Sequence, residues 1–222
     1  MLSLIFSYLQ EGLRHYLFML PVFIPISILF CFLYKKNRIP ITPWFIAGQQ
    51  LFMYLLAIIL TVTGAGSIRD IGRYGNEIIR LEEINLIPFV GWGLSDIFGL
   101  IMNLLMFLPL GVLIPLLWKD GASFLQTAIA GFEFSLLIEI SQLFDRRATD
   151  IDDLIMNTLG AMLGFLVYKL IFRKLTLLQV NNQNHSKWVR YSAHFTLLLV
   201  FLGYFFIGSP LIAFFYRKIY GF

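Results

Sequence analysis

The sequence is poor in charged residues and in cysteine, and it contains no run of basic residues. Charged side chains make up 14% of the 222 residues, whereas an ordinary soluble domain has roughly a quarter. This composition excludes such a domain, and the abundance of aromatic residues excludes a disordered chain. The scattered Lys and Arg form no nucleic-acid patch, so we expect no nucleic-acid partner. The one cysteine, Cys31, has no partner for a disulfide within the chain.

The motifs of several common enzyme classes are also missing. The sequence has no HExxH zinc motif, no phosphate-binding glycine loop of the P-loop type, no GxSxG nucleophile motif and no Cys/His cluster. We therefore expect no cofactor and no metal site.

Apolar and aromatic residues dominate what is present. Hydrophobic residues account for 59% of the chain, and 23 residues are Phe. A helix needs about 20 residues to cross a bilayer, so roughly 120 residues would form six spans. Apolar blocks of this length occupy residues 16–34, 44–62, 97–118, 122–144, 154–172 and 194–216. The sequence predicts an all-α, polytopic membrane helix bundle with about six spans.

The first residues and the prolines add detail to this prediction. Residues 1–15 repeat apolar side chains at helical spacing and carry polar side chains later, which favours an interfacial amphipathic segment lying on the membrane. Pro21 and Pro25 predict kinks in the first span, and Pro210 predicts one in the last. The pair Ser209-Pro210 leaves an early end of the last span as an alternative.

The charges favour an N-terminus outside the membrane. The basic cluster at 35–38 directly follows the first span and is the best local signal for a cytoplasmic loop. With this orientation, Lys and Arg are nearly equal in number on the two sides, while most Asp and Glu lie outside.

Several polar residues fall at one end of the third, fourth and fifth spans. Asn103 lies near the start of the third, Glu139 and Gln142 near the end of the fourth, and Asp153 and Asn157 at the start of the fifth. At 1.5 Å per residue, all lie within about 10 Å of one membrane face. Each pair is spaced by three or four residues and so shares a helix face. We therefore predict a polar, carboxylate-bearing cup that opens on the outer side.

Glycines continue two of these helix faces. Gly160 and Gly164 extend the stripe on the fifth span, and Gly99 and Gly111 flank Asn103 on the third. Glycine at four-residue spacing lets a neighbouring helix approach closely, so we expect a tight trio of helices. Taken singly, the side-chain amides of Asn103, Gln142 and Asn157 are best explained by hydrogen bonds between helices. An ionised glutamate within a span is energetically costly, so Glu139 is a candidate functional residue.

Four stretches, taken in order, resemble the VanZ-like family of bacterial membrane proteins. They are NLIPF at 85–89, NLLMFLPLG at 103–111, EISQ at 139–142 and RATDIDDLIMNTLG at 147–160. The resemblance covers roughly residues 20–172, and its motifs are specific in combination. It carries over onto candidate ligand-binding residues, which are Asn85, Asn103, Glu139, Gln142, Arg147, Asp150, Asp153 and Asn157.

The residue patterns and the resemblance together imply a domain division, a location and a role. We expect an interfacial segment at 1–15, a VanZ-like membrane domain of five spans at 16–174, and a polar loop plus a sixth span at 175–222. The family is linked to resistance to teicoplanin, an antibiotic with an acyl tail that binds cell-wall precursors at the outer membrane face. The resemblance therefore implies a multi-pass protein of the bacterial cell membrane that acts on or binds an envelope lipid or precursor.

Three hypotheses remain open for the mechanism. In the first, a non-enzymatic protein binds a membrane lipid or a lipid-linked head group, with Arg147 and either Arg73 or Arg80 pairing with phosphate. In the second, the protein is a membrane enzyme on a lipid-linked substrate. Its catalytic residues are unknown, and the candidates are Glu139, Asp150 and Asp153. Carboxylates at this depth could serve as a general base or, with Asn oxygen atoms, bind a divalent cation.

The third hypothesis is a proton-coupled transporter or flippase. It would use Glu133 and Glu139 on the fourth span as relay carboxylates. Glu133 matches no family position, and its partner is not apparent from the sequence. The polar residues lie at one face rather than at the midplane, and no internal repeat is evident, so this is the least favoured of the three.

Overall fold

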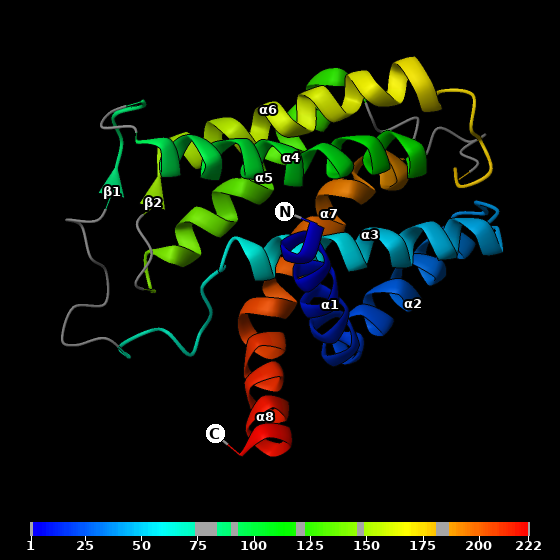
Figure 1. Ribbon diagram of the computed structural model, residues 1–222. Helices are drawn as coiled ribbons and strands as arrows, with labels where there is room; N and C mark the ends of the chain where they lie inside the picture. Colours follow the sequence, from blue (N-terminus) through cyan, green and yellow to red (C-terminus); the bar gives the residue numbers. More distant parts are fainter. Residues whose placement is uncertain are drawn as a thin grey trace.

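The computed structural model describes residues 2–73, 84–89, 93–118, 123–145, 149–180 and 187–221. The described chain is mostly helical (Figure 1). Its elements in order are α1 (Leu2–Phe18), α2 (Leu20–Lys36), α3 (Pro43–Val62), β1 (Ile84–Asn85), α4 (Leu94–Leu117), α5 (Phe124–Gln142), β2 (Thr149–Asp150), α6 (Ile151–Val167), η3 (Tyr168–Phe172), α7 (Lys187–Gly203), η4 (Tyr204–Gly208) and α8 (Ser209–Tyr220). The elements η3 and η4 are π-helical turns.

The spans agree with the apolar blocks. Within the described residues, five helices are long and apolar enough to cross a membrane, and the bent pair α1–α2 adds a sixth if it counts as one span. The five are Pro43–Val62, Ile97–Leu117, Phe124–Gln142, Ile151–Phe172 and Trp188–Ile219. The predicted all-α polytopic membrane bundle of about six spans is confirmed.

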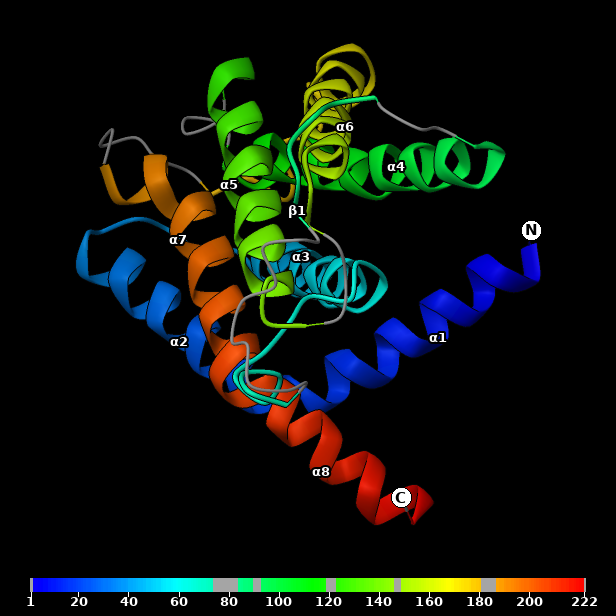
Figure 2. The same ribbon diagram turned by 90° about the vertical axis from the view of Figure 1, so that its left-hand side faces the viewer.

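The first predicted kink is a break between α1 and α2. The two helices meet at 69°, with Met19 between them. Pro21 lies in the first turn of α2, where its missing N–H costs no helical hydrogen bond. Pro25 lies inside α2, which continues to Lys36. Figure 2 shows that α1 and α8 both extend away from the bundle. The interfacial location of α1 stays a prediction.

The last helix does not end at Ser209-Pro210. It runs from Trp188 to Ile219 and contains the π-helical turn η4 directly before this pair. A proline removes one backbone hydrogen bond, and its ring crowds the carbonyl one turn earlier. The wider π-helical turn accommodates this local mismatch, so the chain continues as α8.

The helices α4, α5 and α6 form the expected trio, with α6 packed along α4 (Figure 1). At Gly111, Gly160 and Gly164 an added Cβ would overlap a backbone carbonyl oxygen of the facing helix. The glycines thus permit direct contact between the two backbones. Gly99 does not belong to this contact, because a Cβ there would meet nothing within 4 Å.

A buried hydrogen-bond chain joins three helices at the opposite end of the trio. The Trp118 indole, just after α4, donates to the Tyr34 hydroxyl of α2 at 2.9 Å, and that hydroxyl donates to Ser192 Oγ of α7 at 2.6 Å. Trp118 and Tyr34 are fully buried, and both pack against the Phe45 ring of α3. This cluster connects α7 to the preceding helices.

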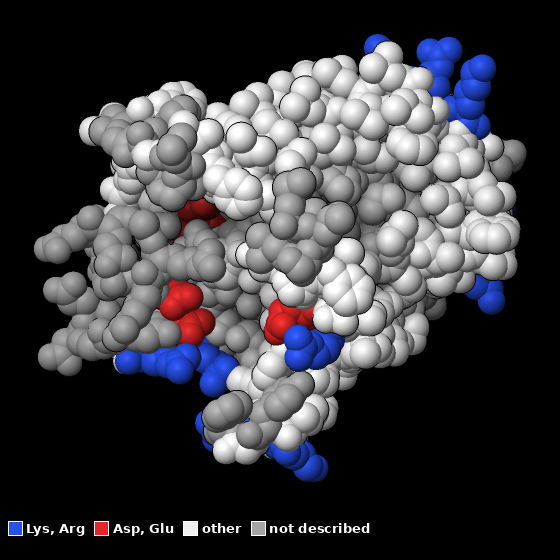
Figure 3. All heavy atoms as spheres, in the orientation of Figure 1, with Lys and Arg blue, Asp and Glu red and all other residues white. Residues whose placement is uncertain are grey.

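The acidic side chains are concentrated towards one end of the spans. In Figure 3, Lys and Arg side chains lie both at the right end and at the lower left, whereas the acidic side chains visible on this face lie towards the left and centre. The right end includes the turn at 35–38 and the segment at 169–174, which contribute Lys35, Lys36, Arg38, Lys169, Arg173 and Lys174. The positive-inside rule predicts that this end faces the cytoplasm.

A short parallel pairing closes the opposite end. Strand β1 pairs with β2 through Ile84 with Thr149 and Asn85 with Asp150. Both strands lie beside the beginnings of α4 and α6 (Figure 1). The pairing fixes the segment before α4 against the N-terminus of α6.

Candidate functional site

Seven polar side chains at this end make hydrogen bonds between neighbouring elements, and they are here named the polar cluster. Its members come from β1, β2 and the adjacent ends of α4, α5 and α6. They are Asn85, Asn103, Ser135, Glu139, Asp150, Asp153 and Asn157. Six of them were predicted from the sequence, and Ser135 was not.

The contact between α5 and α6 forms the buried floor of the polar cluster. Asn157 Nδ2 donates to Ser135 Oγ at 2.9 Å. One turn further along α5, Glu139 Oε2 accepts from the backbone N–H of Asp150 at 3.0 Å. Ser135, Glu139 and Asn157 are all buried, because the two helices pack directly on each other.

The third helix joins through one short hydrogen bond. Asn103 Nδ2 of α4 donates to Asp153 Oδ1 of α6 at 2.6 Å. Asn103 stands next to Leu104, whose carbonyl oxygen faces Gly160. The close approach of α4 and α6 therefore brings the amide and the carboxylate within reach.

Strand β1 supplies the outer edge of the polar cluster. Asn85 Nδ2 lies 3.3 Å from both carboxylate oxygens of Asp150. Asp150 also caps α6, because its Oδ1 accepts from the backbone N–H of Asp152 at 2.9 Å. A carboxylate at this position satisfies a helix donor and interacts favourably with the helix dipole.

Asp152 holds the segment between β1 and α4. Its carboxylate accepts from the backbone N–H of Phe89 at 3.0 and 3.1 Å. Phe89 has a positive φ of 65°, a strained conformation for a residue with a side chain. Asp152 is buried, and its role here is to position the NLIPF stretch at 85–89.

Two buried oxygen atoms of the floor have no hydrogen-bond partner within the described part of the chain. They are Glu139 Oε1 and Asn157 Oδ1. Glu139 is 3% exposed and Asn157 1%. An unpaired buried acceptor is costly, since it has lost its hydration without compensation. These two atoms are therefore unsatisfied acceptors of the floor within the described part of the chain.

The rim is more accessible than the floor. Asn85, Asn103, Asp150 and Asp153 are half-buried. Glu139 Oε2 accepts from the Asp150 N–H, and Asp153 follows Asp150 by three residues, so three carboxyl-bearing residues share this small region. Among the residues that the structure describes, no group of three His, Cys, Asp or Glu side chains is placed to hold a metal ion.

Gln142 contacts a different neighbour from the rest of the predicted set. Its Nε2 donates to the Thr63 carbonyl at 2.8 Å, and its buried Oε1 has no described partner. Ser141 contacts the same segment, because its Oγ accepts from the Gly66 N–H at 2.9 Å. These two residues attach the end of α5 to the segment that follows α3.

Three arginines were candidates for pairing with a ligand phosphate, and the structure describes only one of them. Arg147 and Arg80 lie outside the described residues. Arg73 is described, and its Nη1 lies 3.6 Å from Asp70 Oδ1. The pairing of Arg147 with a ligand phosphate stays a prediction.

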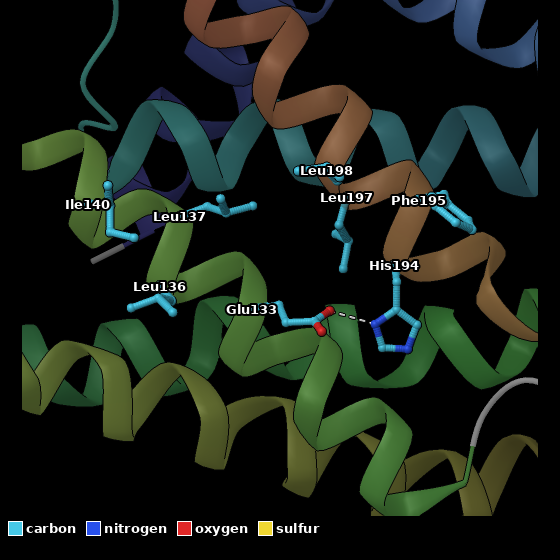
Figure 4. Close-up of a pocket in the computed structure, with 8 residues that line it drawn as sticks. All are labelled: Glu133, Leu136, Leu137, Ile140, His194, Phe195, Leu197 and Leu198. Carbon is cyan, nitrogen blue, oxygen red and sulfur yellow. Dashed lines mark hydrogen bonds and ion pairs between the residues drawn. The ribbon is translucent and has the colours of Figure 1, made fainter.

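Glu133 has a partner that the sequence did not indicate. Its Oε2 lies 2.6 Å from His194 Nδ1 of α7. Figure 4 shows this pair at a pocket of about 300 Å³, which is otherwise lined by Leu136, Leu137, Ile140, Phe195, Leu197 and Leu198. Glu139 instead contacts β2. The two carboxylates considered as a proton relay thus face different elements.

Sequence reasoning missed Ser135 and the Glu133–His194 pair for different reasons. Ser135 precedes Glu139 by one helical turn, so its position on the same face was available from spacing. Glu133 and His194 are 61 residues apart, and no periodic signal connects them. Their contact depends on how α7 packs against α5.

Comparisons with known proteins agree with the family resemblance. A family profile described as VanZ/LLP1 matches residues 51–173. Protein VanZ of Enterococcus faecium is 38% identical over 90 residues, which cover 40% of this chain and 54% of that relative. The match thus spans about half the length of this curated relative. The comparison with solved structures found no match. Because the family profile matches more than half of the sequence, the chain belongs to the VanZ/LLP1 family.

Proposed function

We propose that this membrane protein binds the polar head group of an envelope lipid or lipid-linked cell-wall precursor at the polar cluster. The binding face is the outer face of the bacterial cell membrane. Through this binding the protein lowers the effect of teicoplanin-type antibiotics, as the family resemblance implies.

The buried acceptors of the floor carry this proposal. Glu139 Oε1 and Asn157 Oδ1 have no partner in the described chain, although buried polar atoms are nearly always hydrogen-bonded. A ligand that satisfies them must supply N–H or O–H donors. Sugar hydroxyls, amides and ammonium groups have such donors, whereas an ionised phosphate has none. The polar cluster therefore suits a saccharide, peptide or amino head group.

The surroundings suit a ligand that is anchored in lipid. On α4, Ile101 and Leu105 flank Asn103 and are 48% and 50% exposed, and Ile140 follows Glu139 with 46% exposure. A polar site beside such apolar surface can receive a head group while the acyl or prenyl chain stays in the bilayer. A soluble ligand would gain nothing from this arrangement.

Matched substitutions on α5 test the proposal. A deletion strain is complemented with wild type, Glu139→Gln or Glu133→Gln, and susceptibility to teicoplanin and vancomycin is measured at equal protein abundance. Gln keeps the size of Glu but replaces one acceptor oxygen by a donor group. We expect Glu139→Gln to lose protection against teicoplanin and Glu133→Gln to keep it, because Glu133 lies away from the polar cluster.

Two results of this susceptibility test would contradict the proposal. Full protection by Glu139→Gln at wild-type abundance would exclude a role for the polar cluster. Equal loss in both variants would point to a general effect of glutamates on α5. The phosphate-binding role of Arg147 is tested beside them, with Arg147→Ala expected to abolish protection while the protein still inserts.

An enzyme acting on a lipid-linked substrate is the second candidate. The observation that favours it is the hydrogen bond from the Asp150 N–H to Glu139 Oε2 at 3.0 Å, which brings two carboxyl-bearing residues together, since neighbouring carboxyl groups can divide acid and base roles. Purified protein would then convert an isotopically labelled envelope lipid, and Glu139→Gln would abolish the conversion. Absence of turnover with a broad lipid panel would exclude this candidate.

A further inference from the structure

A pocket with two arginines lies outside the polar cluster, between the segment that follows α3 and helix α8. It has a volume of about 290 Å³ and is lined by Arg69, Arg217, Pro210, Ala213 and Phe214. The two arginines are far apart in the sequence and both are exposed. Figure 3 shows basic side chains gathered at the lower left, over these two segments.

Neither guanidinium of this pocket has a carboxylate partner in the described chain. Among the described residues of the neighbouring segments, the carboxylates of Asp70 and Glu11 have other partners. Asp70 accepts from the N–H and the hydroxyl of Ser67 at 2.8 and 2.7 Å. Glu11 pairs with Arg14 at 2.7 Å. The pocket therefore carries two positive charges that are available to an anion.

The fold fixes this pocket near the membrane face that carries the polar cluster. The Ile68 N–H donates to the Phe205 carbonyl of η4 at 3.1 Å, and the Tyr204 hydroxyl donates to the Ala65 carbonyl at 3.0 Å. The end of α3 and the start of α8 thus share one level. The helix Trp188–Ile219 has 32 residues, so at about 48 Å it exceeds the roughly 30 Å hydrocarbon core, and α8 lies at or beyond the interface.

The side chains around the arginines are apolar and exposed. On α8 these include Phe214, which is 58% exposed, and on the segment after α3 they include Ile68, which is 42% exposed. A phosphate pairs well with two guanidinium groups, and acyl chains suit the adjacent apolar surface. A free inorganic anion would use only the first of these features.

We infer that the pocket formed by Arg69 and Arg217 binds the phosphate diester of an anionic phospholipid. The glycerol backbone and acyl chains extend along Phe214 into the adjoining leaflet. This site anchors α8 at the membrane surface and is independent of ligand binding at the polar cluster.

Native mass spectrometry of the full-length protein in detergent tests this site. The protein is titrated with dioleoylphosphatidylglycerol, and parallel titrations use dioleoylglycerol, which lacks the phosphate, and inorganic phosphate, which lacks the acyl chains. We expect saturable binding of the phospholipid and none of the other two probes. Arg69→Gln and Arg217→Gln should each weaken phospholipid binding about tenfold, because each removes a charge-assisted contact.

Lys218→Gln is the matched control, since it removes the same charge from the neighbouring residue of α8, outside the lining of the pocket. It should bind the phospholipid as wild type does. Unchanged phospholipid affinity in a variant that carries both Arg69→Gln and Arg217→Gln would overturn the site. An equal loss of affinity in Lys218→Gln would also overturn it. Displacement of the phospholipid by equimolar inorganic phosphate would overturn its assignment to a lipid. Glu139→Gln should leave this binding unchanged, so the two proposals fail independently.

Discussion

Replacing Gly160 by alanine is expected to destabilise the contact between α4 and α6. An added Cβ would overlap the Leu104 carbonyl oxygen and lie 3.0 Å from both the Leu104 carbonyl carbon and the Phe107 Cβ. The overlapping atoms belong to the backbone, so no side-chain rotation relieves the clash. The two helices must move apart, and the Asn103–Asp153 hydrogen bond next to this contact lengthens with them.

The size of the effect follows from two opposing terms. Overpacking a close-packed interior costs about 1–3 kcal/mol, and the backbone clash places Gly160 at the upper end of that range. Alanine favours the helical conformation over glycine by about 1 kcal/mol, which offsets part of the cost. We therefore expect the free energy of unfolding to fall by about 2 kcal/mol.

The assay is reversible unfolding of the purified protein in mixed micelles, with Gly99→Ala as the control. Gly99 stands on the same helix pair, but a Cβ there meets nothing within 4 Å. Gly99→Ala should leave stability unchanged or raise it by up to about 1 kcal/mol. If the two variants behave alike, the close backbone contact between α4 and α6 is refuted.

Three further predictions use the same unfolding measurement. A double-mutant cycle of Asn103→Ala and Asp153→Ala should give a coupling of about 0.6–1.7 kcal/mol, and zero coupling would contradict the hydrogen bond between them. Tyr34→Phe should cost about 1–2 kcal/mol because its buried partners on α7 and after α4 lose a hydrogen bond; wild-type stability would contradict this. His194→Leu leaves Glu133 unpaired in a span and should destabilise by about 2 kcal/mol. Adding Glu133→Leu should recover that loss, and a further fall would argue against the pair.

The spans were predictable because each consists of a long apolar run, and lipid requires every backbone group of such a run to be satisfied within a helix. The sequence does not reveal how a helix adapts to proline. The break at Met19 comes before Pro21, whereas Pro210 is accommodated by the π-helical turn Tyr204–Gly208. The presence of a proline in the sequence does not by itself distinguish these two outcomes.

Helical spacing and depth predicted four of the seven members of the polar cluster, and the family resemblance added Asn85 and Asp150. Glu139, Asp153 and Asn157 were placed at one level because they flank the short connection between two spans. The pairing of β1 with β2 was not predictable, since strands of two residues show no alternation of apolar and polar side chains. Gln142 was predicted to join the polar cluster, but its Nε2 donates to the Thr63 carbonyl instead. This contact was not predictable, because the segment after α3 has no periodic pattern.

The most direct measurement of the central claim is native mass spectrometry of protein extracted from its own membrane, with wild type beside Glu139→Gln and Glu133→Gln. Wild type and Glu133→Gln should retain an envelope lipid whose head group carries hydroxyl, amide or amino donors, and Glu139→Gln should lose it. Retention of the same lipids by all three proteins, or of none by the wild type, would contradict binding at the polar cluster.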